Sequence, residues 1–271
     1  MTSAAATLSE SGAGSRTPRW AGAVSSVLGA RRAGAMELGA ATHDTVIGTG
    51  PDVVVVPGLG VSRYLERAQR LIARRARVHR LELPGTADGD QPGAVLTLAG
   101  DAAAVISWLR EHTPDGAVLV GHSYGTQVAA RVAAAVPRLV RGLVLASPTL
   151  DPAYRHLPVL LVRWRMDDAR AARGLAETNR PQQRGTGARR IAAMAVSMLA
   201  DDIETSLRRV SAPVTIMRGE RDALATERWV RHLAATADAD YLNVPGNHTF
   251  PFDRPEELAA AVVGQIEEGR P

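Results

Sequence analysis

Residues 118–125 read Val-Leu-Val-Gly-His-Ser-Tyr-Gly, and this stretch carries the strongest fold signal in the sequence. Its apolar start predicts a short buried strand, and the Ala-rich residues 127–136 that follow predict a helix. Gly121 and Gly125 flank Ser123, and both fit a sharp turn in which strand and helix backbones approach closely. The pattern therefore predicts a strand–turn–helix unit that exposes the Ser123 hydroxyl at the turn.

Short apolar runs alternate with amphipathic segments over most of the chain. This alternation predicts an α/β fold, with a mostly parallel twisted sheet and helices on both faces. Residues 152–209 break the rhythm, because they show helical periodicity but no strand signal, and residues 179–187 within them predict a loop. We expect a helical cap at 152–209, inserted between two parts of one core domain at 36–151 and 210–271. The expected strands are residues 45–47, 53–56, 78–83, 118–120, 143–145, 213–217 and 241–244.

The composition excludes several classes of protein. The chain has 271 residues and no lysine, so all 32 basic residues are arginine, against 28 acidic ones, for a net charge of +4. The arginines are mixed with acids rather than gathered in a stripe, so we expect no nucleic-acid partner. Cysteine is absent, which excludes disulfides, thiolate catalysis and cysteine metal sites. Nothing in the sequence implies a metal or an organic cofactor, and no apolar run is long enough to span a membrane.

The first 35 residues differ from the rest, because they are rich in Ala, Ser and Gly and contain no strand signal. We expect a flexible tail, or a start that extends upstream of a true initiation at Met36. The mildly apolar residues 20–30 are followed by Arg31 and Arg32, whereas a secretory signal carries its positive charge before the apolar run. We therefore expect a cytoplasmic protein, and the composition is typical of a GC-rich bacterial genome.

A serine hydroxyl is a poor nucleophile and needs a base, which His248 is placed to supply. Among seven histidines, His248 follows the last predicted strand directly, within the turn at residues 245–250. A loop at that position reaches the sheet edge at which Ser123 emerges. His122 is adjacent to Ser123 in sequence, but we expect its side chain to point elsewhere in a sharp turn.

The histidine needs a carboxylate that fixes its tautomer and stabilises the imidazolium ion. Asp222 follows the predicted strand at residues 213–217, which gives the chain order Ser123, Asp222, His248 that is expected for this type of site. Two other acids stay open as alternatives, since Glu220 is close in sequence and Asp151 follows an earlier strand.

A developing oxyanion requires two backbone N–H donors. Tyr124, directly after Ser123, is placed to supply one of them from the first turn of a helix. The loop at residues 57–60, Pro-Gly-Leu-Gly, follows the predicted strand at 53–56 and is expected to supply the other from Leu59. The two glycines of this loop allow close approach of the backbone.

With these motifs, the chain from about residue 36 to 268 resembles the α/β-hydrolase fold superfamily, in the form of a capped serine hydrolase with a G-x-S-x-G nucleophile elbow. The family's His-Gly-x-Gly motif is present here as Pro57-Gly58-Leu59-Gly60. Pro57 therefore removes a side-chain support for the oxyanion loop but leaves its backbone donors in place. The resemblance implies a catalytic triad of Ser123, Asp222 and His248.

We expect a serine hydrolase that cleaves an ester or thioester of a small, largely apolar substrate through an acyl-enzyme. The alternatives are a lyase, a C–C hydrolase or a cyclase of secondary metabolism on the same fold, or a non-catalytic binder of small molecules. We expect a small-molecule substrate as the partner, with no membrane or nucleic acid. Five arginines of the cap could bind an anion, but solvated side chains are the simpler expectation: Arg155, Arg163, Arg165, Arg170 and Arg173.

Overall fold

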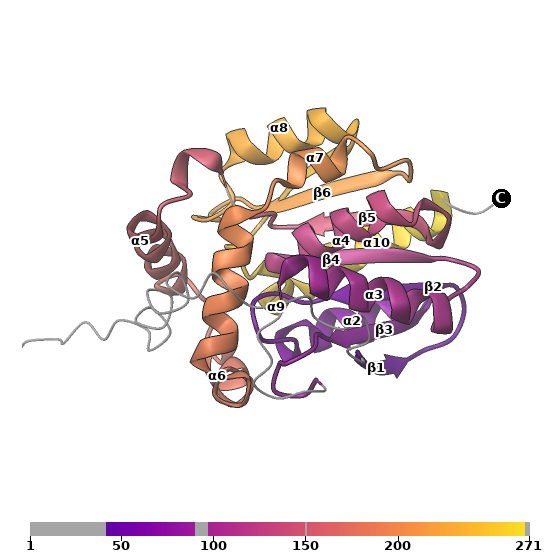
Figure 1. The fold of residues 1–271 in the computed structure, drawn as a ribbon, viewed down its shortest axis with the longest axis horizontal. Helices are drawn as coiled ribbons and strands as arrows, with labels where there is room; N and C mark the ends of the chain where they lie inside the picture. Colours follow the sequence, from indigo (N-terminus) through magenta and orange to yellow (C-terminus); the bar gives the residue numbers. More distant parts are fainter. Residues whose placement is uncertain (1–41, 90–96, 150, 269–271) are drawn as a thin grey trace, which may run out of the picture.

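The structure is a computed structural model that describes residues 42–89, 97–149 and 151–268. Seven strands form one sheet, in the spatial order β1-β3-β2-β4-β5-β6-β7 (Figure 1). The six strands β2 to β7 pair in parallel, whereas the edge strand β1 runs antiparallel to β3. This confirms the predicted mostly parallel sheet. The strands are β1 (His43–Ile47), β2 (Asp52–Val56), β3 (Arg77–Glu82), β4 (Ala117–His122), β5 (Val140–Ala146), β6 (Val214–Gly219) and β7 (Asp240–Val244).

Helices cover both faces of the sheet. Alternate side chains of a strand point to opposite faces, and apolar side chains on each face pack against helices. In β2, Val54 and Val56 belong to the core layer under α3, α4 and α8. Val53 and Val55 belong to the layer under α2 and α10. A strand that is apolar on both sides is therefore buried on both, as its uninterrupted valines predict. The core helices are η1 (Arg63–Leu65), α2 (Glu66–Ile72), α3 (Leu98–His112), α4 (Tyr124–Ala135), η2 (Pro137–Leu139), α8 (Glu227–Ala237), α9 (Phe250–Asp253) and α10 (Pro255–Glu268).

The segment at 152–209 contains helices η3 (Pro152–Tyr154), α5 (Leu157–Asp168), α6 (Leu175–Ala200) and α7 (Ile203–Leu207). Figure 1 shows α5 and α6 beside the sheet, on the left of the view. The last of these helices, α7, packs against α4 and α8, and Ile203 and Leu207 belong to the main core cluster. The C-terminal end of this segment is thus part of the core. The division into core and cap stays a prediction.

The predicted loop at 179–187 is wrong, because these residues lie within α6. Gly187, at φ 76° and ψ 153°, produces only a kink between two helical stretches. Gln182 and Thr186 are buried and hydrogen-bonded to loops of the core, and these contacts hold the helix despite Pro181 and the glycines. Tertiary contacts here override a local sequence signal.

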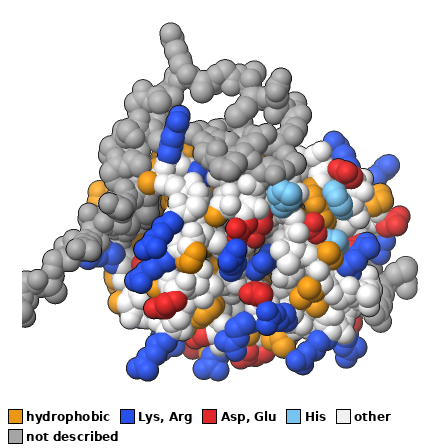
Figure 2. All heavy atoms as spheres, turned by 90° about the horizontal axis from the view of Figure 1, so that it is seen from below, with side chains coloured by type: hydrophobic (Ala, Val, Ile, Leu, Met, Phe, Trp, Pro, Cys, Tyr) orange, Lys and Arg blue, Asp and Glu red, His pale blue; other side chains and the backbone are white. Residues whose placement is uncertain are grey.

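The flexible tail that the sequence predicts at residues 1–35 lies outside the described residues. Within the part of the chain that the structure describes, none of the helices has both the length and the apolar character needed to cross a membrane. On the face drawn in Figure 2, arginine and acidic side chains are intermingled over the described surface.

Candidate active site

Ser123 occupies the sharp turn between β4 and α4. Its backbone, at φ 53° and ψ −120°, lies in a region that residues other than glycine rarely adopt. Glycine is required on both sides of it. A Cβ atom on Gly121 would lie 2.5 Å from the carbonyl oxygen of Gly125, and one on Gly125 would lie 2.2 Å from that of Val56. The sequence therefore produces a strained elbow that holds Ser123 at the carboxyl end of the central strand.

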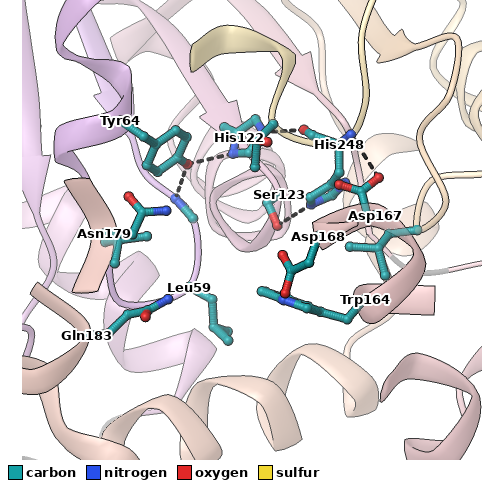
Figure 3. A pocket seen from close by; sticks show the side chains of 14 residues that line it. Leu59, Tyr64, His122, Ser123, Trp164, Asp167, Asp168, Asn179, Gln183 and His248 are labelled. Atoms are coloured by element: carbon teal, nitrogen blue, oxygen red, sulfur yellow. Dashed lines mark hydrogen bonds between the residues drawn. The ribbon is translucent and has the colours of Figure 1, made fainter. Parts of the chain in front are cut away.

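The structure brings Ser123, His248 and Asp222 together in one buried array. The His248 Nε2 atom lies 2.8 Å from the Ser123 Oγ atom (Figure 3). On the other side of the ring, Nδ1 lies 3.0 Å from Asp222 Oδ2 and 3.1 Å from Oδ1. Asp222 follows β6 and His248 follows β7, so the carboxyl ends of three parallel strands supply the three side chains.

Charge and burial set the protonation states of this array. Burial alone would raise the pKa of Asp222, but His248 and the backbone N–H groups of Ala225 and Leu224 lower it below its usual value. Burial would lower the pKa of His248, but the Asp222 carboxylate raises it above its usual value. Nδ1 therefore donates to the carboxylate, which leaves Nε2 of the neutral ring free to accept the Ser123 proton.

Neither alternative acid contacts His248. Asp151 accepts hydrogen bonds from the Ala153 N–H at 2.9 Å and from the Thr226 hydroxyl at 2.8 Å. Glu220 is exposed to solvent beyond the end of β6. Of the three candidate carboxylates, the structure places only Asp222 against the histidine.

The two expected oxyanion donors come from the residue directly after the serine and from a separate loop. Tyr124 begins α4, so its N–H is one of the first-turn groups that have no acceptor within the helix. Leu59 lies in the loop at residues 57–60, called the oxyanion loop after its expected role, and lines the same pocket as Ser123 (Figure 3). The Gly58 N–H of that loop donates to the Tyr64 hydroxyl at 3.0 Å, so it is not free for an oxyanion, and Leu59 stays the donor that the sequence predicts.

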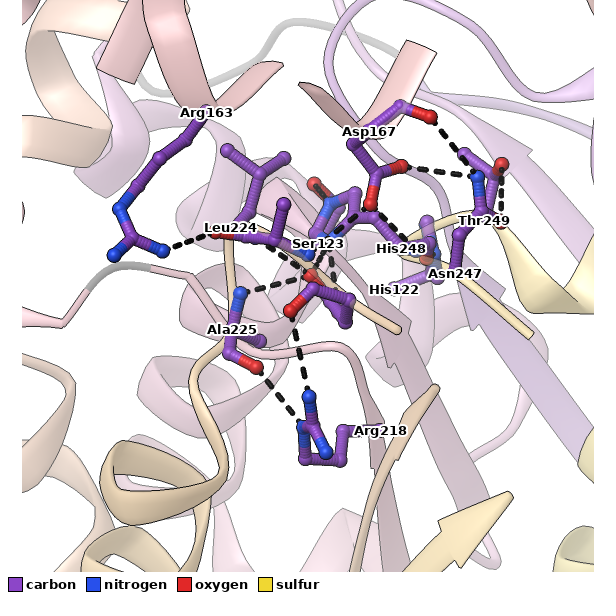
Figure 4. A network of polar contacts seen from close by, with 12 residues as sticks. His122, Ser123, Arg163, Asp167, Arg218, Leu224, Ala225, Asn247, His248 and Thr249 are labelled. Atoms are coloured by element: carbon purple, nitrogen blue, oxygen red, sulfur yellow. Dashed lines mark hydrogen bonds and ion pairs between the residues drawn. The ribbon is translucent and has the colours of Figure 1, made fainter. Parts of the chain in front are cut away.

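Sequence reasoning missed Asp167, which holds the loops that carry Asp222 and His248. Its carboxylate accepts from the backbone N–H groups of Ala223 at 3.2 Å and His248 at 3.1 Å, and from Asn247 Nδ2 at 3.1 Å (Figure 4). Burial raises the pKa of Asp167, although the His248 ring and the backbone N–H groups of Ala223 and His248 oppose the rise. The end of α5 is therefore attached to both loops. The Asp167-Asp168 pair was visible in the sequence, but nothing local indicated its partners.

Arg218 is a second residue that sequence reasoning missed. Its side chain is buried, and Nε donates to the carbonyl oxygen of Ala225 at 3.0 Å (Figure 4). Its other guanidinium nitrogens donate to the carbonyl of Glu220 at 3.2 Å and to the side chain of Asn243 at 2.9 Å. These hydrogen bonds stabilise the backbone turn that carries Asp222.

A small pocket of about 50 Å³ opens beside Ser123. Residues of α5 and α6 form its far wall, and its only lining acids among the described residues are Asp167 and Asp168.

None of the five arginines expected in the cap lines this pocket. Arg163 instead stacks on the Tyr154 ring and donates to the carbonyl oxygen of Ala223. The apolar lining residues are Leu59, Val61, Trp164 and Leu224. Within residues 42–89, 97–149 and 151–268, no group of three or more metal-ligating side chains is placed to hold a metal ion.

Comparison with known proteins identifies the family of this chain. Residues 53–261 match the family described as "Alpha/beta hydrolase family", which is most of the chain, and the protein belongs to this family. A pimeloyl-[acyl-carrier protein] methyl ester esterase from Shewanella oneidensis is 32% identical over 102 residues. That match covers 38% of this chain and 36% of the esterase, so it spans only about a third of the curated relative.

Solved structures share the fold at low sequence identity. A thermophilic esterase from Thermogutta terrifontis superposes with a TM-score of 0.72 at 21% identity, covering 85% of this chain and 94% of that one. The enol-lactonase from Burkholderia xenovorans LB400 superposes with a TM-score of 0.69 at 18% identity, covering 83% and 96%.

Proposed function

We propose that the protein is a serine hydrolase that cleaves a small ester or thioester through an acyl-enzyme. The hydrogen-bonded array of Ser123, His248 and Asp222, open to a pocket, is the observation that carries the proposal. The similarity to a methyl ester esterase and to solved esterase and lactonase structures supports the same reaction class.

In the proposed reaction, the Ser123 oxygen attacks the substrate carbonyl carbon while His248 Nε2 accepts the hydroxyl proton. Asp222 stabilises the imidazolium ion that forms. The N–H groups of Leu59 and Tyr124 stabilise the negative oxygen of the tetrahedral intermediate. His248 then gives its proton to the leaving alcohol or thiol as the carbonyl bond re-forms. Water, activated by His248 in the same way, attacks the acyl-enzyme and releases the acid and the free serine.

The charge of the pocket favours an uncharged substrate. Asp168 lines the pocket, and burial, with the neighbouring Asp167, raises its pKa. No arginine lines the pocket among the described residues, so nothing there compensates a negative acyl group. We propose a small, largely apolar acyl group without a carboxylate.

The selectivity for uncharged esters is expected to depend on Asp168. The wild-type protein should hydrolyse p-nitrophenyl butyrate with a higher kcat/KM than p-nitrophenyl hemisuccinate, because Asp168 repels the substrate carboxylate. Asp168→Asn should reduce this preference by about three- to tenfold, which corresponds to about 1 kcal/mol between partly solvated charges. Asp115→Asn, an exposed acid just before β4 and thus at the opposite edge of the sheet, is the control for net charge. An unchanged ratio in Asp168→Asn would show that this carboxylate does not select the substrate.

A fluorophosphonate probe and a panel of esters test the reaction class itself. The probe is expected to add once per chain, and peptide mapping by mass spectrometry should locate the adduct on Ser123. Hydrolysis of p-nitrophenyl esters of two to ten carbons, and of one thioester, should identify the acyl length that fits the pocket. A protein that is not labelled and hydrolyses none of the panel would contradict the proposal. Labelling without hydrolysis would indicate the lyase, C–C hydrolase or cyclase chemistry that the same fold permits.

A further inference from the structure

His122 is a buried histidine that the proposed reaction does not use, although it is adjacent to Ser123 in the chain. Its ring bridges two partners on opposite sides (Figure 3). Nδ1 lies 2.6 Å from the Tyr64 hydroxyl oxygen, and Nε2 lies 2.9 Å from the backbone carbonyl oxygen of His248. Only 1% of His122 is exposed, so both ring nitrogens depend on these partners.

The partners determine the tautomer of the His122 ring. A carbonyl oxygen can only accept, so Nε2 carries the proton that it donates to His248. Burial and the neighbouring His248 lower the pKa of His122 to about 3, so the ring is neutral and its Nδ1 is an acceptor. The Tyr64 hydroxyl therefore donates to His122 Nδ1.

The Tyr64 oxygen also accepts a hydrogen bond from the Gly58 N–H at 3.0 Å. The three hydrogen bonds thus form one chain. The Gly58 N–H donates to the Tyr64 hydroxyl, and that hydroxyl donates to His122 Nδ1. The His122 Nε2–H then donates to the backbone carbonyl of His248. Tyr64 is 2% exposed, so its side chain is shielded from bulk solvent. Glycine at 58 suits this close packing, because a Cβ atom there would lie 2.9 Å from the Tyr64 hydroxyl oxygen and would have to displace it.

We propose that Tyr64 and His122 are positioning residues that hold the oxyanion loop and the His248 backbone in one arrangement around Ser123. The inference rests on the proposed hydrolase function, since it concerns the geometry of the transition state. The loop needs such support from outside, because Pro57 offers neither an N–H group nor a polar side chain and Gly58 has no side chain.

Removal of the Tyr64 hydroxyl is expected to release the oxyanion loop. Without this hydroxyl, the Gly58 N–H and His122 Nδ1 are buried without partners, and the peptide planes of the loop are free to rotate. The neighbouring Leu59 N–H then no longer points at the position of the oxyanion. Because this donor acts mainly in the transition state, its displacement lowers kcat more than it raises KM.

Tyr64→Phe tests the inference kinetically. We expect kcat on the best ester to fall about 10- to 100-fold, the range that follows from a small misplacement of catalytic groups, with KM changed less than about threefold. Tyr241→Phe is the matched control, because the Tyr241 hydroxyl has no hydrogen-bond partner among the described residues. Circular dichroism must show Tyr64→Phe folded at the assay temperature. A folded variant with wild-type kcat, or one in which only KM rises, would overturn the positioning role.

Nitrogen-15 NMR of the histidine rings tests the same chain without any substrate. The wild-type protein is expected to show His122 as the neutral Nε2–H tautomer throughout pH 5 to 9, and the Gly58 amide as protected from hydrogen exchange. Tyr64→Phe should accelerate exchange at Gly58. An Nδ1–H tautomer, or unchanged exchange, would overturn the inference even if the protein hydrolysed esters. Conversely, if the wild-type protein shows this tautomer but hydrolyses no ester and takes up no fluorophosphonate, the proposed function fails while the hydrogen-bond chain stands.

Discussion

Ser123→Ala is expected to lower kcat for ester hydrolysis by about 10⁵- to 10⁶-fold, among the largest effects of a single substitution in the site. The variant removes the oxygen that attacks the carbonyl carbon, so no acyl-enzyme can form and no fluorophosphonate adduct should be found. The fold should persist, because alanine adopts the same backbone angles as serine. The measurement is kcat with the best ester of the panel, at enzyme concentrations high enough to detect about one millionth of the wild-type rate.

Two comparisons make this result specific to the nucleophile. Ser206→Ala, a serine of α7 outside the pocket, should retain wild-type activity and labelling. His248→Ala should lose activity to a similar extent, because residues that act as one unit are not additive. If Ser123→Ala kept more than about a tenth of the activity while His248→Ala kept none, the histidine would act directly on substrate or water. That result would contradict the acyl-enzyme.

The three residues of the array were predictable because each of them follows a strand in the sequence. Ser123 follows β4, Asp222 follows β6 and His248 follows β7. Parallel strands bring their carboxyl ends to one edge, so residues far apart in the chain meet there without any need to know the packing of the helices. The structure confirms the fold and brings the three side chains together, while their catalytic roles stay predictions.

The residues that support the site were not predictable in the same way. Tyr64 is 58 positions from His122, and Asp167 is 81 positions from His248. Each makes its contact from a helical element whose placement over the sheet follows from packing, not from a local motif. The error at 179–187 has the same origin, because proline and glycine signalled a loop while Gln182 and Thr186 bind the core from a helix.

The attachment of α6 to the core includes a fully buried ion pair between Arg190 and Asp101. One guanidinium nitrogen of Arg190 lies 2.6 Å from Asp101 Oδ1, and both side chains are 0% exposed. The Arg190 Nε donates to the carbonyl oxygen of Pro84 at 3.1 Å, and the Tyr124 hydroxyl donates to Asp101 Oδ2 at 2.6 Å. The network therefore joins α3, α4 and α6 directly behind the elbow.

Arg190→Met is expected to lower the free energy of unfolding by about 3–5 kcal/mol, because it leaves the Asp101 carboxylate buried without its cation. Urea denaturation followed by circular dichroism measures the loss. Arg190→Met combined with Asp101→Asn should be more stable than Arg190→Met alone, since no buried charge then lacks a partner and the asparagine oxygen still accepts from Tyr124. Arg70→Met breaks an exposed pair with Glu66, and after solvent screening it should change stability by less than about 0.5 kcal/mol.

The pH dependence of Arg190→Met separates an uncompensated charge from a simple packing defect. Burial raises the pKa of Asp101 above 3.8 and the Arg190 guanidinium opposes that rise, so removal of the arginine raises this pKa further. Above about pH 4 the unfolded chain releases a proton that the folded variant still binds, so the variant loses stability as the pH rises toward the new pKa. The deficit relative to wild type should therefore shrink as the pH falls toward 4. A deficit that is constant over this range would mean that lost packing, and not the buried carboxylate, accounts for the effect.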